Sequence, residues 1–132
     1  MIGRKKGSSS LTNLELQLMQ VLWREGLSSV QQVQKNLAPS NDLAYTTVQT
    51  VLNTLERKGK VRRSLMRRAY EYEAAITKET VLKQAVWELA ERMFGGSSED
   101  LVMSLVKSRQ VDPARIADLS RRLLAEEEQS DE

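Results

Sequence analysis

The spacing of apolar residues predicts a helix near the start of the chain. Between Leu14 and Trp23, large apolar side chains recur every three or four positions, which is the period of one helical face. Thr12 and Glu15 form a capping-box pattern before this stretch, and Gly26 is placed to end it. We therefore expect an amphipathic helix here, with Trp23 packed against the core or a neighbouring helix.

Two further helices are expected before residue 60. A short one follows a cap at Ser28 and Ser29, and Pro39 should end it. The stretch 44–61 is ambiguous, because its β-branched residues favour a strand whereas its larger apolar residues follow a helical period. Those apolar residues are Val48, Val51, Leu52 and Leu55.

Signals at both ends of this stretch favour a helix. Asp42 is the expected N-terminal cap. Arg57 and Lys58 lie where cations favour the carbonyl end of a helix, and Gly59 can turn left-handed after them. With the apolar residues turned inward, the outward positions are Thr46, Gln49, Thr50, Asn53 and Arg57, and Thr47 lies at the flank.

Residues 61–74 alternate between apolar and polar positions in two runs on either side of Arg67 and Arg68. This pattern predicts a β-hairpin, and we expect Tyr70 and Tyr72 to pack it onto the helices. Two short helices, a third helix and a basic hairpin together predict a winged helix-turn-helix domain.

Three amphipathic helices are predicted after Thr77. They cover about 78–94, about 98–109 and a segment that Asp112 and Pro113 open. Helices of this length cannot close a good core alone, so they pack either on the winged domain or on a second copy of the chain. We favour a second copy, because the apolar faces are wide. The expected dimer interface is Val86, Trp87, Leu89, Leu101, Leu105, Leu119 and Leu123.

The expected fold class is mainly α with a small β-hairpin wing: a winged helix-turn-helix domain followed by a C-terminal helical dimerisation domain. The expected boundaries are a flexible basic tail over 1–10, the winged domain over 11–76, three dimerisation helices over 77–126 and a disordered acidic tail over 127–132. Cations of the first tail could form an arm that touches DNA, although we favour a solvated terminus.

The amino-acid composition excludes several classes of chemistry. The 132-residue chain has no cysteine and no histidine, so disulfides, thiolate metal sites and histidine-based triads are excluded. No carboxylate or lysine cluster suggests catalysis, and we expect neither an enzyme nor a cofactor or metal site. No apolar run approaches the ~20 residues of a membrane span and no signal-peptide core is present, which favours a cytoplasmic protein.

Charge divides the chain into a basic front and an acidic rear. Residues 1–76 hold 12 Lys or Arg against 6 Asp or Glu, whereas residues 77–132 hold 8 against 12. The net positive charge of residues 1–76 therefore suits this part of the chain to binding a polyanion. Hydroxyls and amides on the third helix can bond base edges in a major groove, and hairpin arginines can contact phosphates or reach a minor groove. The candidate DNA-binding residues are Thr46, Thr47, Gln49, Thr50, Asn53, Arg57, Arg62, Arg67 and Arg68.

Two other functions compete with sequence-specific DNA binding. A winged helix can act as a protein–protein interaction module that has no preference among DNA sequences and uses its third helix for docking. The clustered arginines argue against this alternative. An enzyme is disfavoured, because the usual catalytic residue types are missing.

Four segments resemble the penicillinase-repressor (BlaI/MecI/CopY-type) family of transcriptional regulators. They are LTNLELQLMQVLW in the first helix, AYTTVQTVLNTLERKG in the third, YEYEAAITKE after the hairpin, and RMFGGSSEDLVMSLV near the C-terminus. The resemblance covers about residues 11–125. It implies a homodimer that represses transcription by binding an inverted-repeat operator, often of the TACA…TGTA type.

Carried onto this chain, the resemblance implies base and phosphate contacts at Thr46, Thr47, Gln49 and Thr50, assisted by wing arginines. Family members commonly have Arg at the positions of Gln49 and Thr54. Because Gln suits adenine and Arg suits guanine, the preferred half-site is expected to differ.

The sequence at the family's cleavage site also departs from the family pattern. In the family members that β-lactams induce, a membrane sensor-protease system triggers cleavage between Asn and Phe in the C-terminal domain, so the resemblance makes such a system a candidate partner. Here the matching stretch is Met103, Ser104 and Leu105, so the Ser104–Leu105 bond stands where that site is expected. Copper-responsive members carry a cysteine motif, and this chain has no cysteine.

Overall fold

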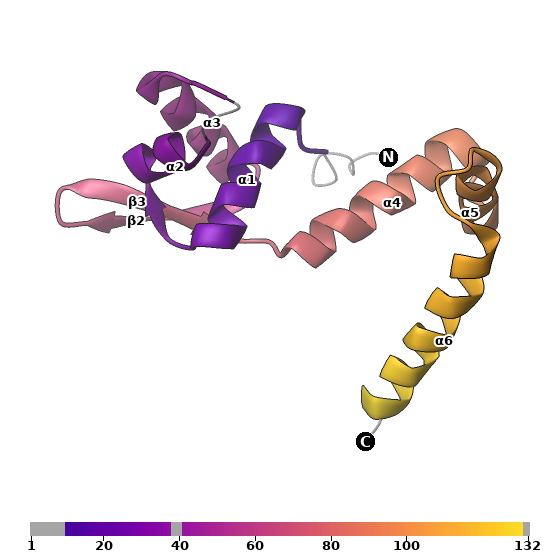
Figure 1. The fold of residues 1–132 in the computed structure, drawn as a ribbon. Helices are drawn as coiled ribbons and strands as arrows, with labels where there is room; N and C mark the ends of the chain where they lie inside the picture. The colour runs from indigo at the N-terminus through magenta and orange to yellow at the C-terminus, as the bar shows by residue number, and fades with distance from the viewer. Residues whose placement is uncertain (1–9, 38–40, 131–132) are drawn as a thin grey trace. The chain divides into compact units, whose positions relative to one another are not determined.

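The computed structural model describes residues 10–37 and 41–130. The fold divides into two compact units, residues 1–85 and residues 86–132. The first unit packs helices against a small antiparallel sheet, and the second consists of helices joined by short turns (Figure 1). The basic segment 1–9, which includes the cations of the predicted tail, lies outside the described residues.

Helix α1 (Asn13–Glu25) begins and ends where the sequence predicts. The Thr12 hydroxyl accepts a hydrogen bond from the Glu15 backbone N–H at 3.1 Å, and the Thr12 N–H donates to Glu15 Oε1 at 2.9 Å. At the other end, Gly26 adopts φ +81° and donates its N–H to the Leu22 carbonyl oxygen. The capping box and the glycine stop are both confirmed.

Helix α2 (Val30–Leu37) follows two serines that have more than one role. Ser29 Oγ accepts a hydrogen bond from the Gln32 N–H at 3.1 Å, which confirms a serine cap. The same pair forms strand β1 (Ser28–Ser29), which lies antiparallel to β3 (Ala69–Ala74). The sequence does not predict this strand, because two residues are too short to show a period. Pro39, the predicted end of α2, lies outside the described residues.

Helix α3 (Tyr45–Arg57) confirms that the helical period outweighs the β-branched composition. Its N-cap is Ala44, which makes no side-chain cap bond, so the predicted cap at Asp42 is wrong. A capping side chain must belong to the residue next to the first helical position, and Asp42 lies too early in the chain. Gly59 has φ +78°, as expected of a left-handed stop.

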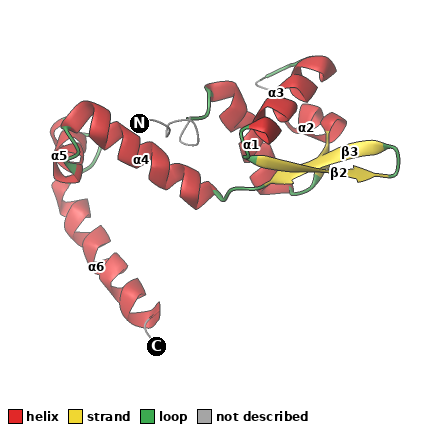
Figure 2. Cartoon of the chain, turned by 180° about the vertical axis from the view of Figure 1, so that it is seen from behind, coloured by secondary structure: helices red, strands yellow, loops and turns green. Residues whose placement is uncertain are grey.

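Strands β2 (Val61–Met66) and β3 form the predicted hairpin, and with the turn Arg67–Arg68 they make up the wing (Figure 2). The sheet order is β1-β3-β2, and the register pairs Leu65 with Tyr70. Arg67 has φ +60°, a conformation that costs a non-glycine residue about 1–2 kcal/mol. The tip of the wing therefore keeps a strained arginine where glycine would fit more easily.

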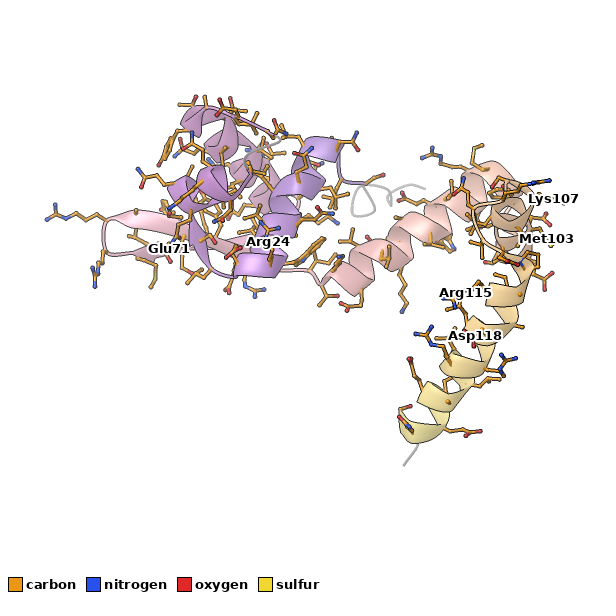
Figure 3. The ribbon with its side chains drawn as sticks, viewed as in Figure 1. Arg24, Glu71, Met103, Lys107, Arg115 and Asp118 are labelled. Carbon is orange, nitrogen blue, oxygen red and sulfur yellow. The ribbon has the colours of Figure 1, made fainter. Side chains whose placement is uncertain are left out.

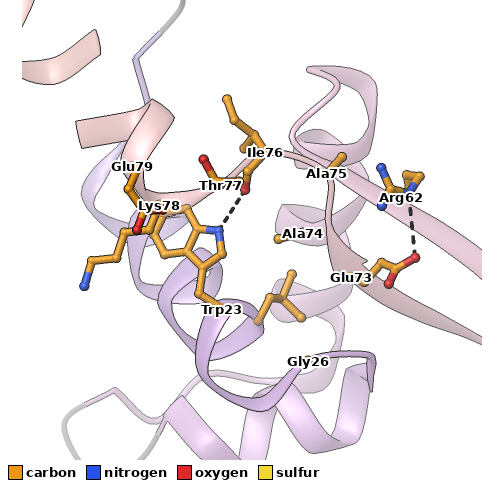
Figure 4. A pocket seen from close by; sticks show the side chains of 11 residues that line it. Trp23, Gly26, Arg62, Glu73, Ala74, Ala75, Ile76, Thr77, Lys78 and Glu79 are labelled. Carbon is orange, nitrogen blue, oxygen red and sulfur yellow. Dashed lines mark hydrogen bonds and ion pairs between the residues drawn. The ribbon is translucent and has the colours of Figure 1, made fainter. Parts of the chain in front are cut away.

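A single apolar core joins the three helices to the base of the wing. Val48 and Leu52 of α3 are fully buried in it. Tyr72 of β3 is 1% exposed and brings the wing into the same core, which confirms its predicted packing. Trp23 covers the edge, where its indole Nε1 donates to the Ile76 carbonyl oxygen at 2.9 Å (Figure 4). This bond fixes the segment that leaves β3.

Three helices follow, as the sequence predicts: α4 (Lys78–Phe94), α5 (Ser98–Lys107) and α6 (Pro113–Ser130). The boundary between the two compact units falls within α4. The side chains of Ser97 and Asp112 accept backbone N–H bonds at 3.1 Å and 2.9 Å, which confirms both predicted caps.

The C-terminal end corrects the prediction of a disordered acidic tail. Helix α6 continues through the three glutamates at 126–128 to Ser130. Glutamate is a good helix former, so a helix already begun at Pro113 extends through these residues. On this helix Asp118 forms ion pairs with Arg115 at 3.3 Å and with Arg121 at 3.5 Å. Arg115 and Asp118 are labelled in Figure 3.

The second unit leaves much apolar surface open to solvent. No side chain of α5 or α6 is buried over the range that the structure describes. Trp87, Met93 and Leu123 are 64%, 65% and 60% exposed. Despite this apolar character, no helix within residues 10–37 and 41–130 is both long and apolar enough to cross a membrane.

Candidate nucleic-acid interface

Helix α3 has one buried face and one exposed face. Its buried side chains pack with those of α1 and α2 in the core, whereas Val51 at the flank is only half-buried. Four of the five polar residues predicted to face outward are exposed, namely Thr46, Gln49, Thr50 and Arg57, and Thr47 at the flank is exposed as well. The exposed face therefore carries hydroxyl and amide groups that can bond base edges.

Asn53 differs from the other polar residues of α3. It is half-buried, and its Oδ1 accepts a hydrogen bond from the Tyr72 hydroxyl at 2.9 Å. Because Tyr72 is almost wholly buried, its hydroxyl needs a partner within the protein. Asn53 thus joins α3 to β3 and holds the wing beside the helix, a role that its outward position in the helical pattern does not indicate.

An ion pair holds the end of α3 to the start of α1. Lys58 Nζ lies 2.9 Å from both carboxylate oxygens of Glu15, which is 6% exposed. Burial raises the pKa of Glu15, but the hydrogen bonds from Lys58 and Thr12 outweigh it, so that the pKa lies below its ordinary value. The charged carboxylate therefore helps to fix α3 in the domain.

The wing arginines differ in their availability to DNA. Arg62 Nε lies 3.6 Å from Glu73 Oε2 (Figure 4), and the register places both on the face of the wing opposite to Tyr72. Arg67 and Arg68 are exposed at the turn, and neither has an ion-pair partner in the part of the chain that the structure describes. The tip therefore has more unpaired positive charge than the base.

Tyr70 corrects the prediction that both wing tyrosines pack onto the helices. Its side chain is 43% exposed, and the guanidinium carbon of Arg63 lies 4.2 Å from the centre of its ring. Leu65, its partner across the hairpin, is 62% exposed. Only the base of the wing is covered by the helices, so the inward face of its outer half meets solvent.

A hollow of about 370 Å³ separates the exposed side of α3 from the wing. Tyr45 and Gln49, one turn apart on α3, line it together with Arg68 and Tyr70 of the wing, and the start of α2 contributes Gln31. Gln49 and Arg68 are predicted contact residues that the structure brings to one site. Tyr45 is not among the residues predicted to contact DNA, although its position four residues before Gln49 places both on one helical face.

The residues predicted for a dimer interface are largely accessible in this single chain. Five of them are exposed: Val86, Trp87, Leu89, Leu119 and Leu123. Leu101 and Leu105 of α5 are half-buried. The apolar faces that the helical period predicts are therefore present, and most of their surface is open.

Known proteins are similar to this chain over most of its length. The family model described as penicillinase repressor matches residues 11–125. The transcriptional regulator BlaI of Mycobacterium tuberculosis is 37% identical over 118 residues, which are 88% of this chain and 83% of that protein. The penicillinase repressor of Bacillus licheniformis is 22% identical over 109 residues, covering 83% of this chain and 85% of that protein.

A solved structure supports the fold. The crystal structure of the transcriptional regulator Tm0710 from Thermotoga maritima has a TM-score of 0.50 and 20% sequence identity, and the match covers 90% of this chain and 77% of that one. At this identity the likeness concerns the fold alone.

Proposed function

The chain belongs to the penicillinase repressor family, and from that premise we propose that it is a dimeric transcriptional repressor that binds an inverted-repeat DNA operator. Family membership makes it a transcriptional regulator and not an enzyme. The observation that carries the DNA-contact model is the exposed, mostly uncharged face of α3 beside two wing-tip arginines that have no ion-pair partner among the described residues. Hydroxyls and amides suit base edges, and arginines suit phosphates.

The structure narrows the set of contact residues that we propose. Thr46, Thr47, Gln49 and Thr50 of α3 enter the major groove, and Arg67 and Arg68 contact the backbone or the minor groove. Asn53, Arg57 and Arg62, which the sequence also suggests, have partners within the protein. We therefore assign all three of them supporting roles.

The homodimer part of the proposal rests on the second unit. Its helices expose large apolar side chains, among them Trp87 and Leu123, and burying such surface against a second copy is favourable by about 25 cal/mol per Å². A two-fold dimer would present two α3 helices to the two halves of an inverted repeat.

Our proposal does not include release by a sensor-protease that cleaves between Asn and Phe. Met103, Ser104 and Leu105 lie inside helix α5 and do not provide an Asn–Phe bond. A protease acting here would need a different specificity, so we favour a release signal other than cleavage between Asn and Phe.

The wing contacts are tested by measuring DNA affinity as a function of salt. The double variant Arg67→Ala/Arg68→Ala should bind every duplex more weakly, and its slope of log affinity against log salt should fall by about 2, because about 0.9 counterion is released per phosphate contact. Arg62→Ala is the matched control, since that arginine is paired with Glu73, and its slope should change little. An unchanged slope in the double variant would contradict wing–phosphate contact.

A further inference from the structure

The hollow between α3 and the wing has a lining suited to an anion. Its polar side chains all contain a hydrogen-bond donor group: the hydroxyls of Ser29, Tyr45, Tyr70 and Tyr72, the Gln31 and Gln49 amides, and the Arg68 guanidinium. The Tyr72 hydroxyl already donates to Asn53, so it is not available to a ligand. No carboxylate is among its lining residues. An anion that enters it therefore meets one positive charge and several donors.

The wing keeps its carboxylates away from this hollow. The register pairs Ser64 with Glu71 and Arg62 with Glu73, so both glutamates alternate with Tyr70 and Tyr72 along β3. Because successive residues of a strand point to opposite faces, the glutamates belong to the outer face of the wing. The inner face of the wing therefore has no carboxylate of its own, and the Glu56 carboxylate of α3 that lies against Arg63 is not among the residues that line the hollow.

The hollow lies where the proposed binding mode would place a DNA backbone. A recognition helix in the major groove, which is about 12 Å wide, has a sugar–phosphate backbone on either side. Gln49 belongs both to the exposed face of α3 and to the lining of the hollow. With α3 in the major groove as proposed above, we expect the backbone on the wing side to pass over the space between Gln49 and Arg68.

The walls of the hollow are held together independently of DNA. Asn53 of α3 accepts a hydrogen bond from Tyr72 of β3, and Arg63 Nε lies 4.0 Å from Glu56 Oε2. These contacts link α3 to the sheet next to the hollow, so little ordering of the protein is needed when a ligand enters.

We propose that this hollow binds one phosphodiester of the operator backbone, with Arg68 pairing the phosphate and the Tyr45 hydroxyl donating a hydrogen bond to it. The proposal rests on the function proposed above and adds a defined backbone site between helix and wing. A volume of about 370 Å³ is in the range of small-molecule sites, so a phosphate with its attached sugar can enter. Tyr45 thereby becomes a contact residue.

The test uses the full-length protein and its preferred duplex, in which single phosphates are replaced one at a time by neutral methylphosphonates. For the wild type, one replacement on the wing side of each half-site should weaken binding about tenfold, since hydrogen bonds to charged groups are strong. In Arg68→Ala the same replacement should have less than a twofold effect, while other sensitive phosphates keep theirs. Tyr45→Phe, which removes only an exposed hydroxyl, should show a partial loss of the effect.

Arg62→Ala on the outer face of the wing is the control, and it should keep the full tenfold effect at every sensitive phosphate. The proposal is overturned if Arg68→Ala and Tyr45→Phe both keep that effect throughout. Failure of the proposed function has a different signature: the wild type would bind a selected duplex no better than a scrambled one.

Discussion

Gln49 and Asn53 lie one turn apart on α3 and carry the same amide group, yet the structure gives them different surroundings. Gln49 is exposed beside the hollow, whereas Asn53 is half-buried and accepts a hydrogen bond from Tyr72, 19 residues away in the chain. Helical spacing predicts that both residues face outward, because it contains no information about a tyrosine that is distant in the sequence. Gln49 is therefore the amide that we expect to read a base.

Gln49→Arg should change the preferred base at one position of each half-site from adenine to guanine. An amide pairs with the N6 and N7 edge of adenine, whereas a guanidinium pairs with O6 and N7 of guanine, and such pairs discriminate by about 1–3 kcal/mol. Affinities for duplexes that differ only at that base pair measure the change. Gln20→Arg, which adds the same charge on α1, should leave the base preference unaltered. A Gln49→Arg protein that keeps the wild-type preference would contradict the assignment.

At the scale of helices and strands, α3 is held in part by polar contacts between residues that are far apart in the sequence. Period and capping patterns predict α1, α3 and the hairpin, because those signals are local. The Glu15–Lys58 pair joins residues 43 positions apart, so no local sequence pattern predicts it. Strand β1 has only two residues, which is too short to show a period. The exposure of Tyr70 is not predictable from local signals either. The alternation of apolar and polar residues predicts a strand, but it does not show that the helices leave the outer half of the wing uncovered.

Glu15→Gln should lower the free energy of unfolding at neutral pH by about 1–3 kcal/mol, because Lys58 loses its charged partner. The pKa of Glu15 is lower in the folded than in the unfolded chain. Its contribution is therefore complete above about pH 4.3, the unfolded value, and is lost as the pH falls through the folded value. Urea unfolding at a series of pH values should show the two proteins converging in acid.

Glu25→Gln provides the control for that comparison. Glu25 pairs with Arg24 at 3.1 Å, but both side chains are exposed, so its removal should change stability by less than about 1 kcal/mol. Equal stability of Glu15→Gln and wild type at neutral pH would show that the buried pair does not hold α3 to α1.

For the whole molecule, the two units differ in how much of their architecture the sequence determines. The first unit closes a core around Val48, Leu52 and Tyr72, so its winged fold follows from one chain. The second unit has the predicted helices but leaves Trp87, Met93 and Leu123 exposed. Helical period identifies such faces without identifying what covers them. We expect a second copy to cover them, which makes stability depend on protein concentration.

Selection of bound duplexes from a random pool by the full-length protein tests the central claim most directly, because it examines base reading and two-fold pairing together. We predict enrichment of an inverted repeat whose half-site centres lie about one helical turn, ~34 Å, apart, as two α3 helices related by a two-fold axis require. A pool that stays random, or that yields an isolated half-site without its inverted partner, would contradict the account of a dimeric sequence-reading repressor.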